Sequence, residues 1–167
     1  MEPLAVSAVN VHYMSQRHDW RTPDRVFADL HAEFDFTVDA CATHENALLS
    51  RFWSEADEPL LRSWEGERVF MNPPYGRQIA RWMEKAWTES PNTEVIVALV
   101  PSRTDTAWWH DYAMKAAEIR FIRGRLEFAG VVKGNPQSHN APFPSCVLVW
   151  RWQAFLDAGW SPWQCRP

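Results

Sequence analysis

An uninterrupted apolar run, V-I-V-A-L-V at residues 95–100, constrains the fold of this chain more than any other feature. A strand without polar alternation must be covered on both faces, as a strand of a parallel sheet is when helices flank it. Residues 34–38, 51–53, 68–71, 119–122 and 146–150 are also apolar or aromatic and predict further strands. The run therefore predicts an α/β fold.

Helical segments alternate with these strands. Ile79, Trp82, Met83 and Ala86 recur at helical spacing and predict an amphipathic helix over 77–90. Thr22, as N-cap, and Pro23, in the first turn, predict a helix over about 23–33, and a third is expected over 104–115. Residues 55–59 and 130–144 are expected to be loops.

The order of these elements predicts a compact, mostly parallel sheet with an antiparallel end and helices on both faces. Residues 1–18 lack periodicity and are expected to form a flexible leader, with a single domain over 19–167. Ligands of such sheets bind beyond the carboxyl ends of the strands.

Composition narrows the classes of function. The chain has 167 residues, with 17 basic and 21 acidic side chains and a net charge of −4, which argues against nonspecific coating of nucleic acid and leaves room for a local basic patch. No apolar run approaches a membrane-spanning length and no secretory signal precedes the domain, so a cytoplasmic protein is expected. The three cysteines lack metal-site spacing, so no metal is expected.

The tetrapeptide N-P-P-Y at 72–75 directly follows a predicted strand. The side-chain oxygen of Asn72 and the carbonyl of Pro73 are suited to accept both hydrogens of an exocyclic amino group, while Pro73 and Pro74 stiffen the turn. Tyr75 offers a flat face for the ring that carries the amine. The alternative interpretation is a capped loop followed by a rigid turn.

Several further blocks occur in a characteristic order: W-R-T-P at 20–23, F-T-V-D-A-C-A at 36–42, E-N-A at 45–47, P-S-R-T-D-T at 101–106, W-W-H at 108–110 and G-R-L at 124–126. With N-P-P-Y, they make residues 19–150 resemble the small phage-type (Dam-like) DNA N6-adenine methyltransferases. The resemblance implies a class I, Rossmann-like methyltransferase fold, S-adenosylmethionine as methyl donor, and adenine in double-stranded DNA as acceptor.

One departure concerns the cofactor turn. Larger amino-methyltransferases carry a glycine-rich D-P-x-C-G-x-G turn, whereas this chain has D-A-C-A-T-H at 39–44. By resemblance, Asp39 with Ala40 and Cys41 contacts the cofactor, Thr22 and Pro23 lie opposite, and Glu58 is the preferred acidic ligand. The alternatives are a loop cap for Asp39, a helix cap for Thr22 and a solvated side chain for Glu58.

A local positive face is expected to bind DNA. Arg103 and Arg125 lie near the predicted site edge and are candidates for phosphate or base contacts, together with Arg123. The loop at 130–144, which includes His139, offers groups for base readout. Ordinary surface charge is the alternative interpretation. An adenine must be flipped out of the duplex before its amine is reached.

Two other classes of function remain open at this point. The same chemistry applies to other planar amines, namely adenine in RNA, N4 of cytosine, or a glutamine amide in a protein. A noncatalytic DNA-binding module with the same fold is the second class, because the glycine-rich turn is missing.

Overall fold

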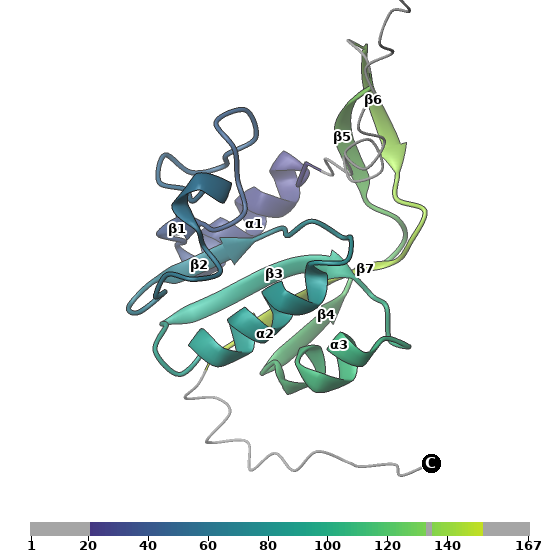
Figure 1. Ribbon diagram of the computed structural model, residues 1–167. Coiled ribbons are helices and arrows are strands. Elements are labelled where there is room, and N and C mark those ends of the chain that lie inside the picture. The colour runs from purple at the N-terminus through teal and green to yellow at the C-terminus, as the bar shows by residue number, and fades with distance from the viewer. Residues whose placement is uncertain (1–20, 133–134, 152–167) are drawn as a thin grey trace, which may run out of the picture.

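A computed structural model describes residues 21–132 and 135–151 of the chain, and of residues 128–132 and 135–140 it describes the backbone alone (Figure 1). The described part contains a five-stranded sheet in the order β1-β2-β3-β7-β4. Its strands are β1 (Val38–Asp39), β2 (Arg68–Met71), β3 (Val95–Pro101), β7 (Ser145–Trp150) and β4 (Glu118–Phe121). The first three run parallel to one another, and β7 is antiparallel to both β3 and β4.

Helices cover both faces of this sheet. Helix α1 (Asp24–Phe34) lies on one side, and α2 (Ile79–Glu89) and α3 (Ala107–Asp111) lie on the other (Figure 1). Short 3₁₀ helices occur at Glu55–Asp57 (η2) and Ala113–Lys115 (η3). The predicted α/β class with helices on both faces is therefore confirmed for the described residues.

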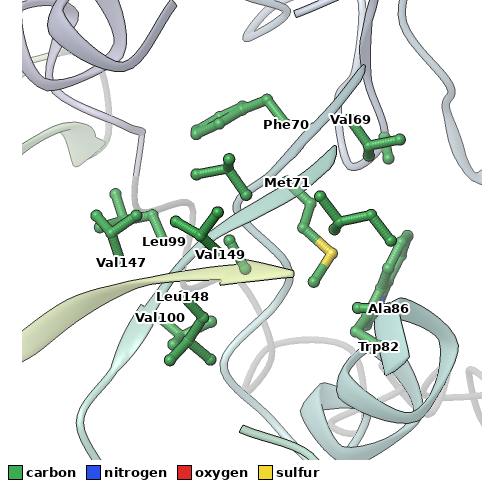
Figure 2. Packing of buried hydrophobic residues seen from close by; sticks show 14 of the residues in the cluster. Val69, Phe70, Met71, Trp82, Ala86, Leu99, Val100, Val147, Leu148 and Val149 are labelled. Carbon is green, nitrogen blue, oxygen red and sulfur yellow. The ribbon is translucent and has the colours of Figure 1, made fainter. Parts of the chain in front are cut away.

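The core forms where alternate strand residues meet these helices. Phe70 of β2 packs edge-on against Phe27 of α1, with ring centroids 5.1 Å apart. The next residue, Met71, points the opposite way and lies beside Trp82 and Ala86 of α2 (Figure 2). All seven residues of β3 are buried, which confirms the prediction of a central strand covered on both faces.

Three local predictions need correction. The antiparallel strand is not at the end of the sheet: β7 is inserted between β3 and β4, and the edge strand β4 runs in the same direction as β3. The first strand is only two residues long, because Phe34 ends α1 and Asp35 leaves the helix with a φ of 48°. The helix expected at 104–115 is divided into α3 and η3, because Tyr112 departs from helical angles.

The segment 130–144, expected to be a loop, is mostly a β-hairpin. Strands β5 (Glu127–Val132) and β6 (Asn135–Asn140) pair antiparallel over six residue pairs. Main-chain groups form this ladder, so the Gly, Pro and Asn residues that favour a loop do not prevent it. Figure 1 shows the hairpin projecting from the sheet beyond the start of β7.

Two smaller predictions have different outcomes. Residues 51–53 contribute one parallel bridge, between Phe52 and Asp39, in place of a full strand. The predicted leader, residues 1–18, lies outside the described residues.

Within the part of the chain that the structure describes, none of the helices has the length and apolar character needed to cross a membrane.

Candidate active site

The parallel strands bring the sequence-predicted site residues to one edge of the sheet. Asp39 ends β1, Asn72 follows β2, and Arg103 follows β3. Because β4 runs in the same direction as β3, Arg123 and Arg125 leave the sheet at this edge too. The start of α1 is also here, since Thr22 contacts Asn72. We call this the carboxyl edge.

The Asn72 side chain is held at both ends of its amide. Its Nδ2 donates a hydrogen bond of 3.0 Å to Oγ1 of Thr22. Its Oδ1 accepts a hydrogen bond of 2.6 Å from the hydroxyl of Tyr75, which also lies 3.3 Å from the carbonyl oxygen of Leu99. Burial raises the pKa of Tyr75 above its usual value, so the hydroxyl keeps its proton and acts as the donor. The amide orientation is thereby defined.

This geometry changes two expectations about single residues. Thr22 is not the N-cap of α1: Pro23 occupies that position, without a side-chain capping bond, and Thr22 faces Asn72 instead. The ring of Tyr75 is only 5% exposed and packs edge-on against Phe143, so it does not present the free face expected for a base. Within the same turn, Pro73 is buried and Pro74 is exposed.

Asp39 organises the turn that lacks glycines. Its carboxylate accepts hydrogen bonds of 3.3 Å from the backbone N–H groups of Cys41 and Leu48, and the residue is 4% exposed. Burial raises its pKa to about 6, although both N–H groups oppose the shift. Ala40 is fully buried and donates its N–H to the carbonyl of Phe70. The contacts that the structure gives Asp39 are thus those of the loop cap.

The same turn explains why the glycine-rich sequence is dispensable. Positive φ angles among the non-glycine residues described occur at Asp35 and Glu58, and neither lies within 39–48. Glycine is required where the backbone enters the left-handed region. A turn that stays outside that region and is held by the Asp39 carboxylate needs no glycine.

Two thiols lie near Tyr75. Burial raises the pKa of Cys41 well above its usual value, against the effect of a hydrogen bond to the backbone of Asn72. Burial also raises the pKa of Cys146 to about 11, and the Ser102 hydroxyl opposes this shift. Both thiols are close enough to Tyr75 to influence its titration. Both are therefore neutral at physiological pH and add no charge to the site.

Glu58 takes no part in the described hydrogen bonds around Asn72, Tyr75 and Asp39. It is exposed and forms the C-cap of η2 with a φ of 49°. Its backbone N–H donates to Glu55, and its carbonyl accepts from Leu61 and Arg62. The described hydrogen bonds of Glu58 are therefore those of a turn, and its cofactor contact stays a prediction.

The candidate DNA-binding arginines share one property. Arg103, Arg123 and Arg125 are exposed, and within the described part of the chain none of them forms an ion pair. His139 belongs to β6, where the backbone alone is described. The structure thus places three exposed arginines, none in an ion pair with a described residue, around the carboxyl edge.

Sequence reasoning missed two features of this edge. Arg77 is exposed and follows Tyr75 by two residues, so its proximity to N-P-P-Y was the available signal. The bond between Thr22 and Asn72 joins residues 50 positions apart, and no local pattern indicates it. Among the described residues, no three His, Cys, Asp or Glu side chains are grouped as metal ligands would be.

Comparisons with known proteins identify the family of this chain. A family model described as DNA N-6-adenine-methyltransferase (Dam) matches residues 11–157. A DNA N-6-adenine-methyltransferase of Haemophilus phage HP1 is 26% identical over 129 residues, which are 75% of each chain. One of Escherichia phage T1 is 33% identical over 109 residues, which are 64% of this chain and 45% of the relative, so the match spans less than half of that protein. The chain belongs to the Dam family of DNA N-6-adenine-methyltransferases.

Proposed function

We propose that this chain transfers a methyl group from S-adenosylmethionine to the exocyclic N6 amine of adenine in double-stranded DNA. The observation that carries the proposal is the fixed orientation of the Asn72 amide at the carboxyl edge, where its Oδ1 is an acceptor held in place by neighbouring groups. Membership of the Dam family supports the same activity. A class I, Rossmann-like fold belongs to the proposal, supported by parallel β1, β2 and β3 between helices.

The turn after β1 fits the proposed cofactor, which supplies an electrophilic methyl group on a sulfonium when bound. A carboxylate buried to the extent of Asp39 is costly when ionised, as its raised pKa shows, and a cationic ligand offsets that cost. S-adenosylmethionine carries such a cation in its ammonium group. We assign Asp39, Ala40 and Cys41 to this end of the cofactor, with Pro23 opposite and Glu58 outside the hydrogen-bonded centre.

Asn72 and Pro73 then act on the acceptor. Their carbonyl oxygens accept the two hydrogens of the adenine amine, which draws the N6 lone pair out of the ring plane and makes it nucleophilic. For Asn72 Oδ1 to accept the amine, the Tyr75 hydroxyl moves from it to the carbonyl of Leu99, already 3.3 Å away. The proton released after transfer passes to solvent. Positioning and desolvation of the reacting groups account for the rate enhancement, so no strong base is needed.

The arginines of the carboxyl edge and the hairpin account for DNA binding in this proposal. Arg103, Arg123 and Arg125 are free to pair with phosphates, and Arg77 adds a fourth exposed cation next to the motif. A two-stranded ribbon has the dimensions to enter the major groove, so we assign base readout to β5 and β6, with His139 among the candidates. The flipped adenine costs a few kcal/mol, which its new contacts offset.

A transfer assay with labelled S-adenosylmethionine tests the proposal. Duplex DNA, RNA and a glutamine-containing protein serve as acceptors, with Asn72→Ala as the matched inactive variant. We expect label in adenine of duplex DNA for the wild type and none for the variant. Label in RNA, in cytosine or in protein would assign the site to another planar amine. Cofactor binding measured by calorimetry, with no transfer to any acceptor, would refute the activity.

A further inference from the structure

The hydroxyl of Thr22 has an unusual position. Thr22 precedes α1 and is only 6% exposed, yet its side chain does not cap that helix. Its Oγ1 instead accepts the Nδ2 hydrogen bond of Asn72, 3.0 Å away and 50 residues further along the chain. A buried side chain that joins the start of a helix to the end of a distant strand fixes the relative position of those two elements.

The direction of this bond matters for Asn72. An asparagine amide has an acceptor end and a donor end, and a rotation of 180° exchanges them. In the observed orientation, Oδ1 faces the hydroxyl of Tyr75, a donor. The rotated amide would present Nδ2 to the same place, where it would repel the hydrogens of an incoming amine instead of accepting them. Correct orientation is therefore a requirement of the proposed chemistry.

Tyr75 holds that orientation only until substrate binds. An amine that binds to Oδ1 takes the place of the Tyr75 hydroxyl, for which the carbonyl of Leu99 is an alternative acceptor. The bond from Nδ2 to Thr22 does not compete with the amine, because it uses the opposite end of the amide. Donation from Nδ2 also polarises the amide toward its oxygen and so strengthens Oδ1 as an acceptor.

We infer that Thr22 is a positioning residue for Asn72, whose hydroxyl keeps Oδ1 aimed at the acceptor amine while Tyr75 is displaced. The inference rests on the proposed function, because it assumes that Asn72 binds an amine. It differs from the role that resemblance implies for Thr22, which is contact with the cofactor. The two roles separate experimentally, since one affects turnover and the other affects cofactor affinity.

Thr22→Val and Thr22→Ser form the matched pair for the kinetic test. Valine keeps the shape and loses the oxygen, whereas serine keeps the oxygen. We expect Thr22→Val to lower kcat by about 10- to 100-fold, as for a misplaced reacting group, while the KM for S-adenosylmethionine changes by less than about twofold. Thr22→Ser should restore most of kcat. Thr93→Val, which removes a buried hydroxyl bonded to Ser90, is the control for loss of packing.

A second readout does not depend on catalysis. The side-chain amide signals of Asn72, identified by their loss in Asn72→Asp, report the Nδ2 hydrogen bond by NMR. We expect these signals to shift in Thr22→Val, to stay near the wild-type position in Thr22→Ser, and to be unchanged in Thr93→Val. This result is expected even if the wild type transfers no methyl group, so failure of the proposed function is distinguishable from failure of this inference.

Two results would overturn the inference. Wild-type turnover together with unshifted Asn72 amide signals in Thr22→Val would show that the hydroxyl does not hold the amide. An increase in the cofactor KM with kcat unchanged would instead make Thr22 a cofactor ligand.

Discussion

The two edges of the sheet differ in whether their arginines form ion pairs. At the amino edge, where the parallel strands begin, Arg68 pairs with Asp35 and Glu94, and Arg51 pairs with Glu67. Arg120 of β4, which pairs with Glu33 and Glu118, belongs to the same set of paired cations. At the carboxyl edge, Arg103, Arg123 and Arg125 have no carboxylate partner among the described residues.

This difference reconciles the net charge of −4 with the DNA-binding face that we propose. Among the described residues, acidic side chains form ion pairs with the arginines of the amino edge, whereas Arg103, Arg123 and Arg125, which lie where the strands end, form none. Such a face attracts phosphates locally, without the diffuse positive field of a protein that coats DNA. It surrounds a centre whose polar side chains, Asn72 and Asp39, are already hydrogen bonded.

The largest effect is expected at the centre of the carboxyl edge. Asn72→Ala removes the acceptor oxygen, so methyl transfer should fall by about 100-fold or more, in line with other losses of a group that acts on developing charge. Fold and cofactor binding should persist. Initial rates with saturating cofactor and DNA measure the loss, and a variant that retains more than a tenth of wild-type activity would contradict the role of Asn72.

Cofactor affinity should depend on Asp39 and on pH. The ionised carboxylate attracts a cationic ligand, so Asp39→Asn should weaken S-adenosylmethionine binding by about tenfold at pH 7.5. Because burial raises the pKa of Asp39 to about 6, wild-type affinity should fall as pH decreases through 6 and should rise to its full value above it. Calorimetric titrations from pH 5 to pH 8 test both statements. An unchanged dissociation constant in Asp39→Asn would assign the residue to loop capping alone.

The contrast between the edges predicts which arginines bind DNA. Arg103→Ala and Arg125→Ala should each lower DNA affinity by several-fold and reduce the slope of log affinity against log salt by roughly one. Arg51→Ala, an exposed cation of the amino edge that is already paired with Glu67, is the matched control and should change neither. Binding isotherms at four salt concentrations decide the question. A slope that changes only in Arg51→Ala would place DNA on the opposite edge.

The smallest effect is expected for Tyr75→Phe. The ring and its packing against Phe143 remain, and the lost hydroxyl is a group that substrate displaces from Asn72 in any case. We expect kcat within about threefold of wild type and a decrease of about 1 kcal/mol in the free energy of unfolding, the usual contribution of one hydrogen bond. Steady-state kinetics and urea unfolding measure the two. A severe loss of kcat would mean that the hydroxyl contacts the substrate.

Local patterns were sufficient for the elements that carry the site. Arg68–Met71 begins and ends where the apolar run does, and the helical spacing of Ile79 and Trp82 locates α2 within two residues at each end. N-P-P-Y lies at a strand end, as predicted. These features depend on residues that are adjacent in sequence, which is why they are readable from it.

Features that depend on distant residues were not predictable. The position of β7 between β3 and β4 follows from long-range pairing. The hairpin at 127–140 is local, but its Gly130, Asn135 and Pro136 individually favour turns. The Thr22 contact and the buried state of Tyr75 arise only when α1 and residue 143 reach the carboxyl edge. The paired charges of the amino edge likewise join residues far apart in the chain, as Arg120 and Glu33 show.

Sequencing of modified bases in DNA from cells that express this chain tests the account most directly, because acceptor, atom and target sequence are read together. The account predicts N6-methyladenine within a defined sequence for the wild type and for Arg51→Ala, and none for Asn72→Ala. Unmodified adenine in the wild type, or equal modification in Asn72→Ala, would contradict the claim that the carboxyl edge methylates DNA.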